Sequence, residues 1–171
     1  PNLAISSIAG NIEGHNVYVA DLILRRDRVA ETVKELITEY QPDVVGLTAM
    51  SFQFATARRI ASLIKNLNKD IKIVLGGYHA TLMYDEICKS EESEPFDFLV
   101  RGEGDICFTE LLEAINGKRA IESVLGISFR NGGCFIHNSP RPLEDLSKIK
   151  IPDRSKRIWK GYQYYGFTLD I

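Results

Sequence analysis

Several features are scarce in this 171-residue sequence, and each absence excludes a class of protein. The three cysteines, Cys88, Cys107 and Cys134, are odd in number and widely spaced, so they indicate neither a disulfide framework nor a metal-ligand cluster. No apolar run approaches the roughly 20 residues of a membrane span, and no signal peptide is visible. With 21 basic and 23 acidic residues, the chain lacks the basic excess of a nucleic-acid-binding surface. We therefore expect a protein of the reducing cytoplasm, in which Cys88 and Cys107 serve packing.

Motifs for several common chemistries are also absent. The sequence contains no Gly-x-Gly-x-x-Gly dinucleotide fingerprint, no phosphate-binding loop with Gly-Lys-Ser/Thr and no Gly-x-Ser-x-Gly elbow of a hydrolase. The three histidines, His15, His79 and His137, stand in separate segments and predict no metal site. Because nothing supplies a nucleophile or a matched acid–base pair, we expect this chain by itself to have no catalytic activity.

A regular alternation of apolar runs and helical patterns is present. Continuous apolar runs predict strands at 17–21, 44–48, 71–75 and 96–100. Apolar residues at helical spacing predict helices over 3–12, 27–40, 54–67, 81–90 and 104–116. Strands separated by helices imply right-handed crossovers and a parallel sheet covered on both faces. The expected fold is α/β, a flavodoxin-like doubly wound sheet whose first strand would precede Pro1.

The character of the sequence changes after Gly117. Apolar runs at 124–130 and 134–136 flank Asn131-Gly132-Gly133 and predict a β-hairpin. Prolines punctuate the next segment, which we expect to be an ordered connector that docks on the domain. We therefore divide the chain into an α/β domain, 1–118, and a hairpin with connector, 119–171. The chain begins without Met and ends on a strand-like run, so we expect it to belong to a longer protein.

The tail of the sequence is rich in aromatic side chains and poor in charge. An exposed patch of that kind promotes association. We expect it to pack against a domain outside this chain, or to fold back or pair with a second copy when that domain is absent. The aromatic residues concerned are Trp159, Tyr162, Tyr164, Tyr165 and Phe167.

Small and polar residues follow three of the predicted strands. These strand-end loops are Thr48-Ala49-Met50-Ser51, Gly76-Gly77-Tyr78-His79-Ala80-Thr81 and Arg101-Gly102-Glu103-Gly104. The carboxyl ends of parallel strands share one edge of a sheet, ~5 Å apart sideways, and open α/β sheets bind ligands there. The glycine pair removes every side chain from that position, and Thr81 is placed to cap the next helix. The loops therefore predict a site for a wide, flat ligand with a polar tail.

Each of these features also has an explanation without a ligand. The Gly-Gly pair is then only a tight turn from strand to helix. Glu103 and the following Asp105 then serve only to complement the positive end of a helix dipole. For the two carboxylates this structural role is the favoured interpretation, and we assign neither a catalytic function.

The ordered motifs resemble the N-terminal cobalamin-binding domain of cobalamin-dependent radical-SAM enzymes. That family includes the anaerobic cyclases of magnesium-protoporphyrin monomethyl ester and many methyltransferases. The resemblance covers most of the chain, and its motifs are specific in this order rather than singly. They are QPDVVGLT at 41–48, GGYHAT at 76–81, VRGEGD at 100–105, RPLEDL at 141–146 and IPDR at 151–154.

The resemblance implies a cobalamin whose nucleotide tail lies beside the sheet and whose corrin ring lies over the strand ends. By it, residues 48–51 face the tail and lower ring, Gly76 and Gly77 admit the tail, residues 78–81 flank it, and residues 101–104 lie by the tail or ring edge. It also implies a radical-SAM domain in the same polypeptide, with a [4Fe-4S] cluster and S-adenosylmethionine. That domain would follow the Pro152 region and carry out methyl transfer or radical cyclisation on a hydrophobic substrate.

The chain departs from related cobalamin domains at the cobalt ligand. Methionine-synthase-like domains supply a histidine from Asp-x-His-x-x-Gly, whereas the segment around His15, Glu13-Gly14-His15-Asn16-Val17-Tyr18, lacks both the Asp and the Gly. We interpret His15 as a surface turn residue and assign no metal ligand. His79 could reach the lower face of the ring, although contact with the tail or shaping of the turn is the favoured role.

A different class of function also fits the motifs. A degenerate cobalamin-type domain would keep the fold and act as an interaction or sensor module without cofactor, because fold and function are separable. Bulky residues such as Tyr78 and Met50 would then fill the groove between the sheet and a helix.

Overall fold

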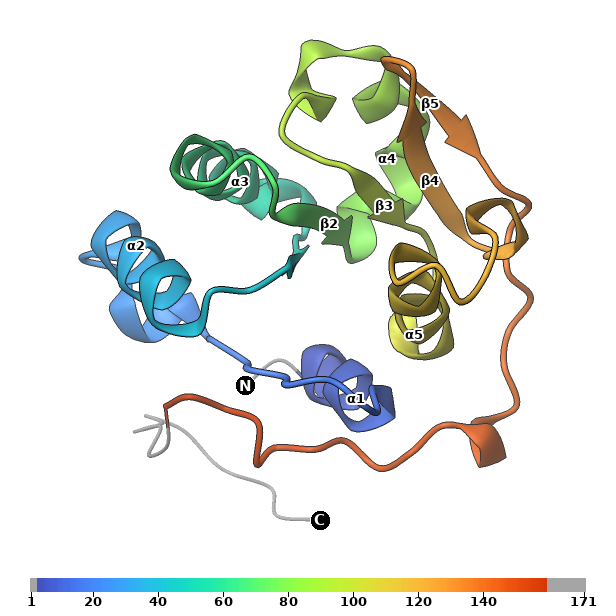
Figure 1. Ribbon diagram of the computed structural model, residues 1–171, viewed down its shortest axis with the longest axis horizontal. Helices are drawn as coiled ribbons and strands as arrows, with labels where there is room; N and C mark the ends of the chain where they lie inside the picture. The colour runs from blue at the N-terminus through green and yellow to red at the C-terminus, as the bar shows by residue number, and fades with distance from the viewer. Residues whose placement is uncertain (1–2, 160–171) are drawn as a thin grey trace.

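The computed structural model describes residues 3–159, which form an open sheet with helices on both faces (Figure 1). Its helices are α1 (Leu3–Asn11), α2 (Val29–Tyr40), α3 (Phe54–Leu67), α4 (Tyr78–Lys89) and α5 (Gly104–Ile115). Its strands are β1 (Val44–Thr48), β2 (Lys72–Gly76), β3 (Phe98–Val100), β4 (Ile127–Asn131) and β5 (Cys134–His137). The α/β fold class predicted from the alternating patterns is confirmed.

The strands lie in the order β1-β2-β3-β4-β5 within one sheet. The first three are parallel, with Leu47 opposite Leu75 and Leu75 opposite Leu99. The predicted hairpin is confirmed as β4 and β5, which pair antiparallel, and β4 also pairs antiparallel with β3. Gly132 and Gly133 at its tip have φ angles of 58° and 92°, which suit glycine. The hairpin therefore extends the sheet across the boundary predicted at residue 118.

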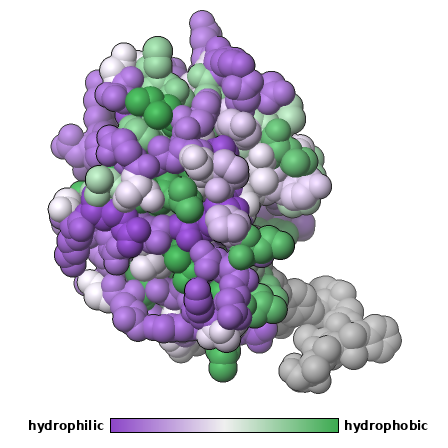
Figure 2. All heavy atoms as spheres, turned by 90° about the vertical axis from the view of Figure 1, so that its right-hand side faces the viewer, coloured by the Kyte–Doolittle hydropathy of each residue, from purple (hydrophilic) through white to green (hydrophobic). Residues whose placement is uncertain are grey.

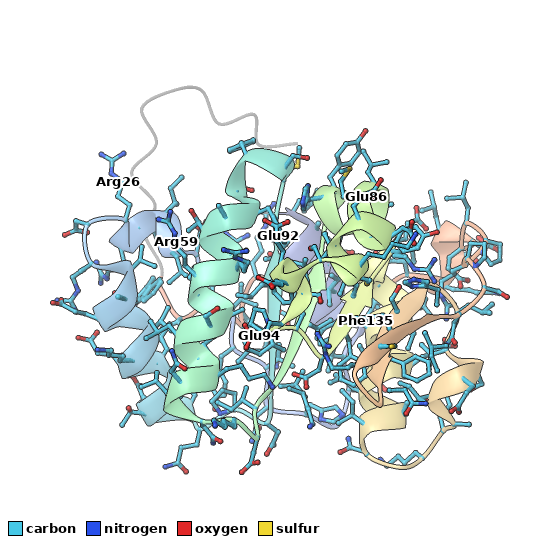
Figure 3. All side chains as sticks on the ribbon, turned by 90° about the horizontal axis from the view of Figure 1, so that it is seen from above. Arg26, Arg59, Glu86, Glu92, Glu94 and Phe135 are labelled. Atoms are coloured by element: carbon cyan, nitrogen blue, oxygen red, sulfur yellow. The ribbon has the colours of Figure 1, made fainter. Side chains whose placement is uncertain are left out.

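Alternate side chains of the central strands supply a separate core on each face of the sheet. Ile73 and Leu75 pack with Leu99 beneath α2, α3 and α4, which lie side by side in Figure 3. Val74 and Val100 point to the opposite face, where they pack against α5. Burial on both faces explains why these strands are continuous apolar runs, since each such side chain contributes about 1.5–3 kcal/mol when removed from water.

Helix α1 packs beside α5 on the same side of the sheet (Figure 1). The two helices approach closely at Gly104, where a Cβ atom would lie 2.9 Å from Ile8 Cδ1. The hydroxyl of Ser7 donates to the Asp105 carboxylate, and the hydroxyl of Thr109 donates to the backbone oxygen of Asn11 at 3.2 Å. A small residue at position 104 therefore allows the two helices to pack.

The predicted strand at 17–21 is wrong. Val19 makes only one isolated bridge, to Arg157. Its N–H donates to the backbone oxygen of Lys156 at 2.9 Å, and its own oxygen accepts from the N–H of Ile158 at 3.0 Å. Both backbone groups of Val19 are therefore used by the connector. Of the four parallel strands predicted, the described residues contain three.

The predicted connector is ordered, and it crosses α5 and then α1 (Figure 1). The buried guanidinium of Arg141 contacts Glu110 of α5 and donates to Glu144 at 2.6 Å. Farther along, the Asp153 N–H donates to the backbone oxygen of Ser6 at 2.8 Å. These contacts at both ends explain how a segment with little secondary structure keeps a defined path.

Several remaining predictions concern the ends and surface of the chain. His15 is exposed in a bend, as predicted. The aromatic tail lies outside the described residues apart from Trp159, whose ring lies 5.2 Å from the Arg25 guanidinium. Within residues 3–159, no helix is both long and apolar enough to cross a membrane.

Candidate functional site

Backbone hydrogen bonds hold the first two strand-end loops against each other. The Ala49 N–H donates to the Gly76 oxygen at 3.1 Å, and the His79 N–H donates to the Ala49 oxygen at the same distance. Ala49 is fully buried between them. The structure therefore brings residues 48–51 and 76–81 together at the carboxyl edge of β1 and β2.

The two glycines of the second loop have different roles. Gly77 has a φ angle of +90°, and a Cβ there would lie 2.5 Å from Thr48 Oγ1 and 3.0 Å from backbone atoms of Ala49. A Cβ on Gly76 would meet nothing closer than Val100 Cβ, at 3.9 Å. Gly77 is therefore required by the turn itself, whereas a Cβ at Gly76 would make only ordinary van der Waals contacts.

Thr81 does not cap the helix as predicted. Helix α4 begins at Tyr78, and its N-cap is Gly77. The positive φ of Gly77 turns the chain directly into the helix, so no capping side chain is used. Thr81 instead links two loops, because its hydroxyl donates to the Gly77 oxygen at 3.0 Å and accepts from the Gly102 N–H at 2.9 Å.

Arg101 and Gly104 of the third loop have partners outside the other two loops. The Arg101 guanidinium donates to the backbone oxygens of Ile127 at 2.8 Å and Asn138 at 2.5 Å. It also lies 4.6 Å from the centre of the Tyr84 ring. These contacts direct the Arg101 side chain toward the hairpin and α4. Gly104 is likewise committed to packing against Ile8, as described above.

Gly102 and Glu103 are the members of the third loop that remain exposed at the edge. Gly102 has a φ angle of +78°, and nothing lies within 4 Å of where its Cβ would be. Glu103 precedes α5 as its N-cap residue, and Asp105 lies in the first turn, as the helix-dipole interpretation predicts. The loop therefore supplies the backbone of Gly102 beside Thr81, while the Glu103 carboxylate accepts from the Glu144 N–H of the connector at 3.5 Å.

His79 has a defined orientation at the junction of the first two loops. Its ring lies 4.3 Å from the Phe54 ring, centre to centre, and its Nδ1 is 3.1 Å from Ser51 Oγ. The imidazole therefore presents its other nitrogen, Nε2, away from Ser51. Sequence analysis selected His79 and Ser51 but missed Phe54, which patterning assigns only to the buried face of α3.

Exposed apolar side chains surround these loops. Phe52 is 82% exposed, Tyr78 58% and Met50 46%. Leu82 and Met83 of α4 are exposed as well. Tyr78 and Met50 therefore point outward and do not fill the space beside the sheet. Sequence analysis missed Phe52, Leu82 and Met83, because exposure of a single apolar residue leaves no trace in a sequence pattern.

The described residues contain no cluster of metal-ligating side chains, and burial disfavours the reactive thiolate form of two cysteines. No group of three or more His, Cys, Asp or Glu side chains in the described part of the chain could hold a metal ion. Burial raises the pKa of both Cys88 and Cys107 to about 11. The Cys107 thiol is fully buried and donates to the Leu125 oxygen at 3.2 Å. These environments agree with the packing roles predicted for both residues.

Comparison with known proteins identifies the family. The family model described as the B12 binding domain matches residues 1–112 of the chain. The chain belongs to the B12-binding domain family.

Curated relatives cover all or most of this chain but extend well beyond it. An uncharacterized methyltransferase of Pyrococcus horikoshii is 32% identical over 100% of the chain and 37% of its own length. An anaerobic magnesium-protoporphyrin IX monomethyl ester cyclase of Rubrivivax gelatinosus is 34% identical over 82% of the chain and 26% of its own length. The chain thus spans little more than a third of these relatives at most.

Solved structures show the same fold at lower identity. The radical S-adenosylmethionine methyltransferase TsrM from Kitasatospora setae, with cobalamin and a [4Fe-4S] cluster bound, aligns with a TM-score of 0.70 and 22% identity, over 91% of this chain and 29% of TsrM. The cobalamin-dependent S-adenosylmethionine radical enzyme OxsB aligns with a TM-score of 0.67 and 17% identity, over 90% of this chain and 21% of OxsB.

Proposed function

We propose that this chain binds cobalamin at the strand-end loops and presents it to a radical-SAM domain of the same polypeptide. The convergence of the three loops at the carboxyl edge of the sheet carries the proposal, because open α/β sheets bind ligands there. Membership of the B12-binding family and the names of the curated relatives support it. Methyl transfer or radical cyclisation would then be the reaction of the whole protein.

The residues of the loops fit a corrinoid. Gly76 presents only backbone to an approaching nucleotide tail, and the exposed Gly102, with nothing within 4 Å of its Cβ position, leaves room beside it. The hydroxyls of Thr48 and Ser51, with Nε2 of His79, offer hydrogen bonds to the polar tail. The proposed site comprises Thr48, Ala49, Met50, Ser51, Gly76, Gly77, Tyr78, His79, Ala80, Thr81, Arg101, Gly102, Glu103 and Gly104.

The exposed apolar residues fit the ring of the cofactor. Met50, Phe52 and Tyr78 would cover part of the hydrophobic face of a corrin and exclude water from it. Bound cobalamin supplies a cobalt centre able to carry a methyl group. The [4Fe-4S] cluster and S-adenosylmethionine would belong to the radical-SAM domain, so this chain contributes binding and orientation only.

The proposal is tested by mixing the protein with hydroxocobalamin, desalting it and recording the visible spectrum. We expect about one corrinoid per folded chain to elute with the protein. A folded protein that elutes without corrinoid absorbance would contradict the proposal. As a matched control, Arg59→Ala changes an exposed residue of α3 outside the loops and should leave retention unchanged.

The cofactor-free alternative is not favoured by any contact in the structure. A degenerate site would be filled by bulky side chains, whereas Tyr78 and Met50 are about half exposed. The position beside Gly102 is also open. We therefore propose no second function for these loops.

A further inference from the structure

The first two strand-end loops are joined by backbone hydrogen bonds, because β1 and β2 pair as far as their carboxyl ends. The last pair of the parallel ladder is Thr48 opposite Gly76. The Ala49 N–H then donates to the Gly76 oxygen at 3.1 Å and continues the pairing beyond the strands. The loops at 48–51 and 76–81 therefore leave the sheet as one unit.

The third loop, residues 101–104, follows the hairpin instead. Strands β2 and β3 pair over only two residues, and their ladder stops at Leu75 opposite Leu99. Strand β3 stays paired with β4 through Val100, and the Arg101 N–H then donates to the Gly126 oxygen at 2.8 Å. The hairpin lies on the side of the molecule that Figure 2 turns toward the viewer, where hydrophobic side chains are scattered among hydrophilic ones. The third loop therefore belongs with the hairpin rather than with the first two loops.

A single side chain crosses between these two units. The hydroxyl of Thr81 accepts from the Gly102 N–H at 2.9 Å and donates to the Gly77 oxygen at 3.0 Å. Among residues 3–159, no other hydrogen bond joins the third loop to either of the first two loops. The distance between the third loop and the others at the edge of the sheet therefore depends on this hydroxyl.

The first turn of α4 holds Thr81 in place. Met83 has non-helical φ and ψ angles of −114° and 17°, which separate this turn from the rest of the helix. Contacts of the turn itself fix its position, because the His79 N–H donates to the Ala49 oxygen at 3.1 Å and the Ala80 side chain is fully buried. The turn therefore moves with the first two loops, and Thr81 reaches from it to the third.

We propose that Thr81 is a positioning residue, which fixes the third loop relative to the other two and thereby sets the affinity of the site for cobalamin. This inference rests on the proposed function and adds a role for one residue of the same site. The one hydrogen of the Thr81 hydroxyl is already donated to the Gly77 oxygen, so this group is not free to donate to a ligand. It acts through Gly102, whose exposed backbone forms one wall of the site.

Backbone amide exchange tests the link without any cofactor. Although Gly102 is exposed, its amide in the wild type should exchange at least about tenfold more slowly than in an unstructured peptide. Thr81→Val keeps the shape of the side chain but removes the hydroxyl, so it should abolish most of this protection. The Gly77 oxygen keeps the N–H of residue 81 as a donor, at 3.1 Å, and the Arg101 amide keeps its bond to Gly126. Exchange at Arg101 should therefore be unchanged.

Cobalamin affinity tests the consequence of the link. Loss of one hydrogen bond predicts that Thr81→Val binds hydroxocobalamin about fivefold more weakly than the wild type, at a nearly unchanged melting temperature. Thr81→Ser retains the hydroxyl and should restore both the affinity and the protection of the Gly102 amide. A purely structural role would lower the melting temperature and the affinity together.

Thr38→Val is the matched control. The Thr38 hydroxyl donates to the Lys34 oxygen at 2.9 Å, four residues earlier, as the Thr81 hydroxyl does to Gly77, but it lies on the exposed side of α2. This variant should change neither the exchange at Gly102 nor the affinity for hydroxocobalamin.

Three results would overturn the proposal. The first is a Gly102 amide that is unprotected in the wild type, or equally protected in Thr81→Val. The second is wild-type affinity for hydroxocobalamin in Thr81→Val, and the third is an equal loss of affinity in Thr81→Ser or Thr38→Val. A folded wild type that binds no hydroxocobalamin would instead contradict the proposed function, and exchange at Gly102 would still decide whether Thr81 holds the third loop.

Discussion

Thr48 and Gly77 are in such close contact that a single added carbon would not fit between them. A Cβ on Gly77 would lie 2.5 Å from Thr48 Oγ1, whereas a Cβ on the neighbouring Gly76 would come no closer than 3.9 Å to its nearest contact, Val100 Cβ. The two halves of the Gly-Gly pair therefore serve different purposes. Gly77 forms the turn from β2 into α4, and Gly76 can take a Cβ without a clash.

This difference predicts opposite behaviour for substitutions at the two glycines. Gly77→Ala should lower the free energy of unfolding by about 1–3 kcal/mol, because it strains a positive φ and clashes with Thr48. Gly76→Val should leave the melting temperature near that of the wild type but abolish cobalamin retention. Thermal melts and spectra of both variants measure the two effects. A Gly76→Val protein that retains cobalamin normally would remove Gly76 from the site.

Arg101 should contribute more to folding stability than to cobalamin binding. Its guanidinium donates to the carbonyls of Ile127 and Asn138. Arg101→Met would remove both bonds and leave the Asn138 carbonyl without this donor, whereas the Ile127 carbonyl keeps the N–H of Asn138. We expect a loss of about 1–3 kcal/mol in urea unfolding. Arg101→Lys should rescue this only in part, because an ammonium does not reproduce the planar fork of donors. Unfolding of Arg101→Met at the wild-type urea concentration would contradict this role.

The lowered pKa of His137 predicts that the free energy of unfolding decreases in mild acid. Burial lowers its pKa below 6.5, and Arg101 lowers it further, while Asp85 opposes the shift. The unfolded chain therefore takes up this proton at a higher pH than the folded chain does. The contribution is present above about pH 6.5 and is lost as the pH falls through the lowered pKa of the folded state.

Melting temperatures between about pH 8 and about pH 5 measure this effect. His137→Gln should flatten the upper part of that profile, because glutamine keeps a polar group near Ser128 Oγ without titrating. A variant with the same pH dependence as the wild type would show that other groups cause it.

The three cysteines should differ in reactivity. Burial raises the pKa of Cys88 and Cys107 to about 11, whereas Cys134 is exposed on β5. Since thiolate is the reactive form, a thiol reagent at about pH 8 should modify Cys134 rapidly and the other two slowly. Mass spectrometry of the native protein checks this, with Cys134→Ser as the control. Rapid labelling of Cys107 in the folded protein would show that α5 opens from the sheet.

Local patterns were sufficient to predict much of the fold. The strand at 44–48 and the helix at 54–67 form with the predicted bounds, and the hairpin forms around Gly132-Gly133. These elements could be predicted because apolar periodicity and turn-forming residues are properties of short, contiguous segments. The predicted strand at 17–21 fails for the opposite reason. Its apolar run is real, but a strand needs a neighbour, and the backbone of Val19 pairs with the connector instead.

In the strand-end loops, too, some features follow from the local sequence and others depend on distant residues. Their convergence follows from the order of the parallel strands, which the sequence pattern predicts. The direction of the Arg101 side chain depends on carbonyls of the hairpin, more than 20 residues away, and no local pattern contains that information. The start of α4 at Tyr78 depends on the φ angle of Gly77, which the sequence permits but does not specify.

The central claim is that cobalamin binds at the strand-end loops, and hydrogen exchange with and without hydroxocobalamin tests it most directly. The account predicts that the cofactor slows exchange in peptides covering residues 48–51, 76–81 and 101–104. Peptides of the connector around Lys150 should be unaffected. Bound cobalamin that leaves all three loops unprotected, or that protects the connector instead, would contradict the account.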